Sequence, residues 1–208
     1  MSLAKEMNLA MSDWINQEFA ALYLYDALSK DFLQKKSKST TFAAFFEIIK
    51  ERHQSHATQI RALIRRNRWI IRWQIEDPPS SSDLPKSAKT SMALPREKED
   101  RLFRSMKNLQ EMAIASGVET VARLLKDLVD EQRDMLLVVS MHEERLKLVT
   151  SEEEEEEYDD FMFHTMLPGW KLSGMWRDRK KPNPPAKIPR IREPPKITDS
   201  GFWDEDDE

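Results

Sequence analysis

The sequence predicts an all-α fold, an antiparallel bundle of four helices with one long crossover connection between the second and the third. Apolar residues recur every three or four positions through most of residues 1–150, which is the spacing of a helix that buries one stripe. The chain has only four glycines, and its eleven prolines all follow residue 77. These features are typical of helical proteins and not of an α/β nucleotide-binding fold.

The apolar stripes and the residues that interrupt them place the four helices in order. Pro78 and Pro79 stop the second helix, and residues 80–89 are expected to form the long surface crossover. Pro95 suits a first helical position, and Gly117 separates the last two helices. The expected ranges, in chain order, are 8–35, 42–73, 95–116 and 118–148.

Length and composition bound the domain organisation. A chain of 208 residues is expected to hold one helical domain, residues 1–150, followed by an acidic and then Pro-rich extension, residues 151–208. The absence of cysteine excludes disulfides, thiolate metal sites and thiol nucleophiles. No apolar run approaches the ~20 residues of a membrane span, so no transmembrane segment is expected.

Five polar residues interrupt the apolar stripes, and every helix contributes at least one. They are Glu18, His53, His56, Glu99 and Gln132. Buried polar groups need partners, so we expect these side chains to meet inside the bundle. Carboxylates and imidazoles that converge in a four-helix bundle form metal sites, whereas one such residue alone is usually a satisfied core group. The pattern indicates either a metal site or a hydrogen-bonded cluster.

From about residue 12 to residue 148 the chain resembles the ferritin family. The matching segments are Ile15-Asn16-x-Glu18 followed by Tyr25, Phe42-Ala43 through His56-Ala57, and Val129-Asp130-Glu131-Gln132, with Glu99 as the carboxylate of the third helix. The resemblance implies a ferritin-like bundle and places Glu18, His56, Glu99 and Gln132 at the positions of the family's iron site.

One position departs from the family pattern in a way that bears on activity. The resemblance implies a glutamate three residues before His56, where it would bridge two irons, and this chain has His53 there. An imidazole offers one lone pair and cannot bridge two cations as a carboxylate does. We therefore expect no ferroxidase activity, and a vestigial site that holds either one Fe, Zn or Mn ion or no metal at all.

Two regions outside the predicted core carry the residues that anchor protein interfaces. The segment 168–203 is rich in proline, is expected to be extended, and contains four aromatic residues proposed to bind partners: Trp170, Trp176, Phe202 and Trp203. The end of the second helix, residues 61–73, combines arginine with tryptophan. Both regions are expected to contact other protein subunits, and pairing with another ferritin-like bundle is a further expectation.

Three functions are compatible with these patterns. We favour a non-catalytic accessory subunit of a large assembly, such as a mitochondrial respiratory or ribosomal complex, whose bundle is a packing block. The alternative is a divergent ferritin that oxidises or stores iron. A nucleic-acid-associated protein is less favoured, because the sequence pI is near 5.7 and the chain ends in acidic residues. A mitochondrial location is a guess, with the cytoplasm as the alternative.

Overall fold

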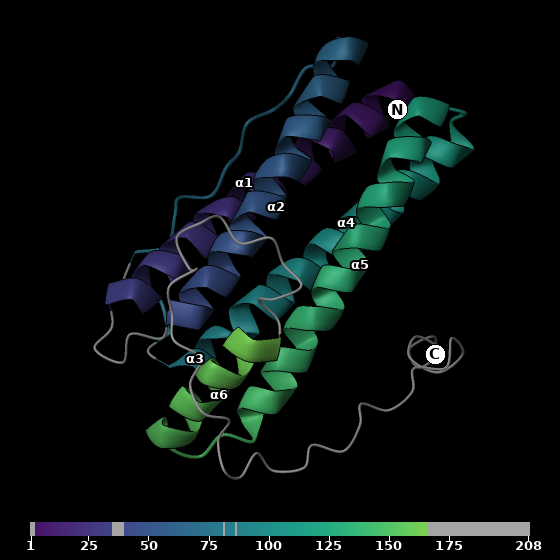
Figure 1. Cartoon of the computed structure of the whole chain (residues 1–208). Coiled ribbons are helices and arrows are strands. Elements are labelled where there is room, and N and C mark those ends of the chain that lie inside the picture. The colour runs from purple at the N-terminus through teal and green to yellow at the C-terminus, as the bar shows by residue number, and fades with distance from the viewer. Residues whose placement is uncertain (1–2, 35–39, 81, 86, 166–208) are drawn as a thin grey trace, which may run out of the picture. The chain divides into compact units, whose positions relative to one another are not determined.

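A computed structural model describes residues 3–34, 40–80, 82–85 and 87–165 of the chain (Figure 1). These residues form helices and no strand, which confirms the all-α class. The helices are α1 (Leu3–Gln34), α2 (Thr40–Asn67), α3 (Ala88–Ser91), α4 (Ala93–Ala115), α5 (Glu119–Lys147) and α6 (Glu152–Thr165). None of the described helices is both long and apolar enough to cross a membrane.

Two long helical hairpins build the bundle. Helix α1 packs along α2, α4 packs along α5, and α1 also contacts α4 (Figure 1). The segment between α2 and α3 is the predicted long crossover. Large side chains from the helices fill the interior, among them Trp14, Phe32, Phe46, Ile49 and Ile60, each no more than 1% exposed.

The second helix ends earlier than the sequence indicates. Arg68 takes a left-handed conformation with φ 55°, so the helix stops before it and does not run on to Trp73. The N–H of Trp69 donates to the carbonyl of Ile64 at 3.1 Å, a bond that reaches back over the left-handed residue and closes the helix C-terminus. The apolar residues beyond this point therefore belong to the crossover.

The third helical region begins earlier than expected, with a short separate turn. Ser87 caps α3: its hydroxyl accepts from the N–H of Thr90, and the Thr90 hydroxyl accepts from the N–H of Ser87. Helix α4 follows directly, so Pro95 lies in its first turn, where a missing N–H costs no hydrogen bond.

Helix α6 is an element that the sequence analysis does not predict. Residues 152–165 form a helix, and two of its side chains pack on the bundle: Tyr158 is 9% exposed and Met162 is 1% exposed. The hydroxyl of Tyr158 lies 2.7 Å from Nδ1 of the buried His142. The proposed division into domains 1–150 and 151–208 stays a prediction, because residues 166–208 lie outside the described part of the chain.

Acidic side chains of α6 close the N-termini of two other helices. Asp159 Oδ1 accepts a hydrogen bond from the N–H of Phe42, in the first turn of α2, at 3.0 Å. Glu155 Oε1 accepts from the N–H of Ala88, the first residue of α3, at 2.7 Å. The first N–H groups of a helix have no partner within the helix, and a carboxylate also interacts favourably with the helix dipole there.

Replacing Asp159 with alanine should therefore lower stability. Loss of a helix-capping acceptor costs about 1 kcal/mol, which lowers the melting temperature of a protein of this size by about 2–4 °C. Thermal unfolding followed by circular dichroism would measure the shift. The matched control is Asp160→Ala, because Asp160 is the next carboxylate along α6 and is exposed; equal melting temperatures for the two variants would contradict the capping role.

Candidate metal centre

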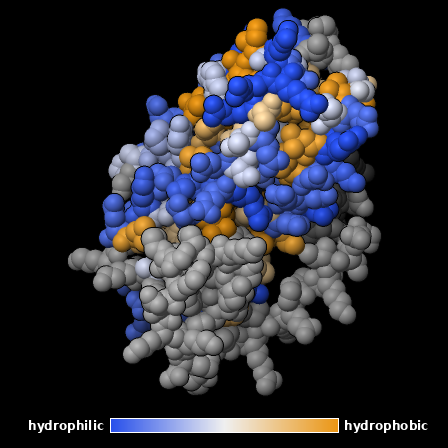
Figure 2. All heavy atoms as spheres, turned by 45° about the horizontal axis from the view of Figure 1, so that its top comes forward, coloured by the Kyte–Doolittle hydropathy of each residue, from blue (hydrophilic) through white to orange (hydrophobic). Residues whose placement is uncertain are grey.

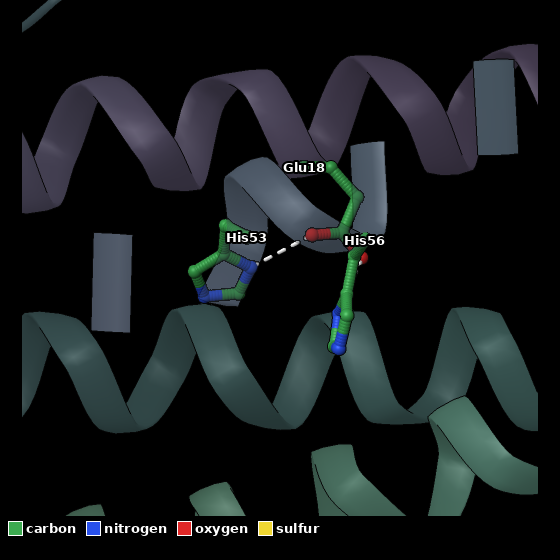
Figure 3. Close-up of side chains that lie close together, drawn as sticks. All are labelled: Glu18, His53 and His56. Atoms are coloured by element: carbon green, nitrogen blue, oxygen red, sulfur yellow. Dashed lines mark hydrogen bonds and ion pairs between the residues drawn. The ribbon is translucent and has the colours of Figure 1, made fainter. Parts of the chain in front are cut away.

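The five polar residues singled out from the sequence all lie inside the bundle. Glu18 comes from α1, His53 and His56 from α2, Glu99 from α4 and Gln132 from α5, and none is more than 1% exposed. Figure 3 shows Glu18 reaching from α1 toward the two histidines. These residues lie on the apolar stripes of their helices, which face the bundle centre. Their side chains therefore lie inside the bundle, as expected.

His53 lies between two carboxylates and contacts both. Its Nδ1 is 2.7 Å from Oε2 of Glu18, and its Nε2 is 3.1 Å from Oε1 of Glu99. An ionised carboxylate oxygen can only accept a hydrogen bond, so each ring nitrogen must carry a proton to donate. With both carboxylates ionised, this arrangement corresponds to the positively charged imidazolium form of His53.

The electrostatics of the cluster agree with this protonation state. Burial alone would lower the pKa of His53, but the charges of Glu99 and Glu18 and their hydrogen bonds raise it to about 10. Burial alone would raise the pKa of Glu18, but the hydrogen bond and charge of His53, with a smaller contribution from His56, lower it to about 2. A buried anion and a buried cation thus stabilise each other.

The remaining carboxylate oxygens are also occupied. Oε1 of Glu18 accepts from the indole N–H of Trp14 at 2.8 Å. Glu99 accepts from the Tyr25 hydroxyl at Oε1 and from the Gln132 side-chain amide at Oε2. All four carboxylate oxygens at the centre therefore have a protein donor.

Of these donors, Tyr25 is named in the sequence analysis and Trp14 is not. Tyr25 belongs to the segment that resembles the ferritin first helix, and its ring stacks on His53 with centroids 5.3 Å apart and an interplanar angle of 5°. Burial, then the charge of Glu99, raises the pKa of Tyr25, so its hydroxyl stays a donor. Trp14 was not predicted as part of the site; the signal that could have found it is its position four residues before Glu18, on the same helix face.

His56 is held less tightly than His53. Its Nδ1 lies 3.5 Å from Oε1 of Glu18, a contact without hydrogen-bond geometry, and it has no hydrogen-bond partner among the described residues. Its Nε2 lies 3.4 Å from Oε2 of Glu131. Because this buried Nδ1 has no hydrogen-bond partner in the described part of the chain, it is available to bind something else.

Histidine, and not a carboxylate, lies between Glu18 and Glu99. A two-metal centre needs a carboxylate that bridges the ions, and the side chain between Glu18 and Glu99 is an imidazolium, which repels cations. The oxygens that would bind metal already accept protein hydrogen bonds. Glu18 and Glu99 act instead as counter-ions of His53.

One metal ion fits the geometry of a smaller set. Ligand atoms of Glu18, His53 and His56 all lie within 4.8 Å of one another, close enough to surround a single ion. Histidine must be neutral to bind a metal, so His53 would have to release its proton first. The structure thus contains a triad that could hold one ion, which fits the first of the two expectations from the sequence, one metal ion, and does not fit the second, no metal.

The other residues predicted to bind partners are only partly described. Trp170, Trp176, Phe202 and Trp203 lie outside the described residues, so their role stays a prediction. The Arg/Trp-rich stretch is described: all of its arginines are exposed, and Trp73 is 55% exposed.

Comparisons with known proteins find similarity at the level of structure. No protein-family model and no curated protein sequence matches the chain. Among solved structures it is similar to an open-pore ferritin from the hyperthermophilic archaeon Archaeoglobus fulgidus, with a TM-score of 0.67 and 19% identity over 77% of this chain and 98% of that one. It is also similar to a ferritin from the green alga Ulva pertusa, with a TM-score of 0.68 and 20% identity over 76% of this chain and 84% of that one. The chain therefore has the ferritin-like fold.

Proposed function

We propose that this chain is a non-catalytic, ferritin-like structural subunit of a larger protein assembly. The observation that carries the proposal is the position of His53, whose two ring nitrogens contact Glu18 and Glu99. A bundle that catalyses iron oxidation needs open coordination positions at its centre. This centre is filled by its own hydrogen bonds, which serves packing and not catalysis.

The assembly would be held through surfaces outside the bundle core. The aromatic residues Trp170, Trp176, Phe202 and Trp203 are the proposed anchors of the C-terminal segment, and the exposed end of α2 is a second contact region. Tryptophan and arginine are the residue types that contribute most to protein interfaces. A mitochondrial respiratory or ribosomal complex remains our proposed setting, and a second ferritin-like bundle is a proposed neighbour.

A second candidate function is that of a divergent iron-binding protein. It is favoured by the unpartnered Nδ1 of His56 and by the compact triad that this residue forms with Glu18 and His53. The structural neighbours are ferritins. This candidate requires the His53 proton to be displaced, so metal content of the purified protein, measured together with its native mass, separates the two functions.

Ferrous iron added to the full chain in air should give no rapid, saturable oxidation. The reason is that no carboxylate bridges two metal positions while His53 occupies the centre. The variant His53→Glu supplies that carboxylate and should recover part of the oxidation, whereas His53→Gln, which cannot bridge, should not. Rapid oxidation of a pair of irons per chain by the unmodified protein, or a native mass of a closed cage loaded with iron, would contradict the proposal.

Stability at alkaline pH should depend on His53. The folded-state pKa of this histidine is about 10 against an ordinary value of 6.5, so the stability it contributes is complete below pH 6.5 and is lost as the pH rises through about 10. Urea unfolding of the unmodified protein and of His53→Gln across this range measures the difference. Their free energies of unfolding should converge as the pH rises. His142, whose pKa is lowered to about 4 by burial and by Arg145, is common to both proteins and cancels. Curves that stay parallel would show that His53 does not titrate as described.

Replacing Trp170, Trp176 and Trp203 together with alanine should release the full-length chain from its assembly. Each buried tryptophan is expected to contribute about 1.5–3 kcal/mol, so each loss weakens binding by about tenfold or more. Native mass measurement of the complex purified from its source would detect the release. The control is Leu137→Ala, at a half-exposed position on α5. An assembly of unchanged mass and occupancy would show that these residues are not the anchors.

A further inference from the structure

The segment that follows α2 is bound along the side of α1. We call residues 69–77 the strap. Side chains on successive turns of α1 bind its main chain, and Figure 1 shows the strap running beside this helix. The bonds join Asn8 Nδ2 to Ile70 O (2.9 Å), Ser12 Oγ to Arg72 N (3.2 Å), Asn16 Nδ2 to Arg72 O (2.7 Å) and Asn16 Oδ1 to Gln74 N (3.2 Å).

The spacing of these bonds shows that the strap is extended like a β-strand. Four residues of a helix rise about 6 Å, and two residues of a strand span about 6.6 Å. The binding positions advance by four residues along α1 for every two along the strap, so the two repeats match. Exposure alternates in part: Ile70, Arg72 and Gln74 are exposed and Ile71 and Ile75 are half-buried, but Trp73 is exposed as well.

One edge of the extended strap has no hydrogen-bond partner among the residues that the structure describes. In an extended chain the N–H and C=O groups of alternate residues point to opposite edges. The groups of residues 70, 72 and 74 point to α1, so those of Ile71, Trp73 and Ile75 point away from it. No described residue forms a hydrogen bond with these outward main-chain groups. Such an edge is a template for a further strand.

Exposed arginines lie on the strap and at the end of α2. Arg72 stands between Ile71 and Trp73, and Arg68 directly precedes the strap, whereas Arg66 lines a pocket between α2 and α5. Five arginines are exposed at the end of α2 and on the strap, and none has an ion pair with a described acidic residue; they are Arg61, Arg65, Arg66, Arg68 and Arg72, here called the arginine cluster. Figure 2 brings the end of the bundle where α2 stops toward the viewer and shows strongly hydrophilic atoms beside hydrophobic ones. The hydrophobic side chains of this region include Ile70, 77% exposed, and Trp73, 55% exposed.

Two features of the cluster indicate that its charge has a use. Every basic residue from 61 to 73 is arginine, although the chain contains many lysines, and the guanidinium fork binds a carboxylate through two parallel hydrogen bonds. Arg68 also holds the left-handed position, φ 55°, at which glycine closes helices without steric cost. Arginine, a residue with a long charged side chain, is thus present where the backbone conformation favours glycine, which has no side chain.

We propose that the strap receives an acidic, extended segment of a partner protein, which adds as a second β-strand along Ile71, Trp73 and Ile75. Main-chain groups of the partner pair with the free edge, and its carboxylates pair with the arginine cluster. The proposal rests on the proposed function in one respect, that the chain binds another protein. It names the chemistry of that partner and the place where it binds.

Charge and main-chain chemistry favour this occupant over two others. The phosphates of a nucleic acid could pair with the arginines, but a nucleic acid has no peptide groups that could hydrogen-bond to the free edge. The strap of a second copy would bring only Glu76 and Asp77, and Glu76 already lies 3.6 Å from Lys98. Pairing of two straps would therefore leave the arginines of α2 without partners.

Amide hydrogen exchange of the full-length chain, followed by NMR, tests the proposal. The probe is a short peptide of alternating glutamate and valine. At saturation it should slow exchange at Ile71, Trp73 and Ile75 by about tenfold or more, and leave Arg72 and Gln74, whose N–H groups already donate, unchanged. A lysine–valine peptide and poly(U) RNA are the comparison probes.

Variants separate the two parts of the interaction. Arg68→Glu with Arg72→Glu should weaken binding of the acidic peptide by about tenfold or more, which corresponds to about 1.4 kcal/mol or more. Ile75→Pro removes one outward N–H and should weaken it as well. The matched control is Lys107→Glu with Lys126→Glu, an equal change of charge at exposed lysines of α4 and α5, which should bind as the unmodified chain does.

Three results would overturn the proposal. Equal slowing by the lysine–valine peptide or by RNA would show that acidic peptide is not the specific occupant. Slow exchange at the outward positions without peptide would assign the edge to a second copy if it rises with protein concentration, and to the chain's own C-terminal segment if it does not. Failure of the peptide to bind would also reject the proposal, while leaving the account of the His53 centre unchanged, because iron oxidation tests that account separately.

Discussion

A buried imidazolium between two carboxylates is the interaction on which this bundle depends. His53 joins α2 to α1 through Glu18 and to α4 through Glu99, so one cation holds three helices at a common point. Two carboxylates buried together without a cation would repel each other and lose their hydration, and removing one partner of a buried ion pair commonly costs about 3–5 kcal/mol. His53 brings positive charge to this point of the bundle, between the two carboxylates.

The dipole of α2 explains part of the charge distribution at its two ends. Asp159 accepts from the first turn of α2, and Arg65 and Arg66 lie in its last turn, so anion and cation are each at the end that the helix dipole favours. That influence fades within one turn. It does not account for Arg68 and Arg72, which lie beyond the helix and have no acidic partner among the described residues.

The sequence predicts both the bundle and the meeting of its polar residues, because both depend on the helical repeat of the apolar residues. Glu18, His53 and Glu99 lie on apolar stripes, and a residue on a stripe must face the core. The end of α2 is not predicted, because Trp69 and Ile71 continue the apolar run although they lie beyond the helix, partly buried against the core. Helix α6 was missed because a run of glutamates suggests a solvated segment. Its capping bonds to Phe42 and Ala88 join residues far apart in sequence, which local patterns do not reveal.

Hydrogen bonding differs between the polar groups at the bundle centre and those on the strap at the surface. The four carboxylate oxygens at the centre accept from donors on the same chain, at the cost of the open positions that metal chemistry needs. At the strap, main-chain groups bond to side chains of α1, and no described residue bonds to the outward groups of Ile71, Trp73 and Ile75. A free strand edge is a template for pairing, and like charges that lie close together repel one another, so an acidic strand of the kind proposed above would answer both features. Among the described residues, the unpaired groups proposed to bind a partner or an ion therefore lie at two places, the outward edge of the strap and the buried Nδ1 of His56 at the centre.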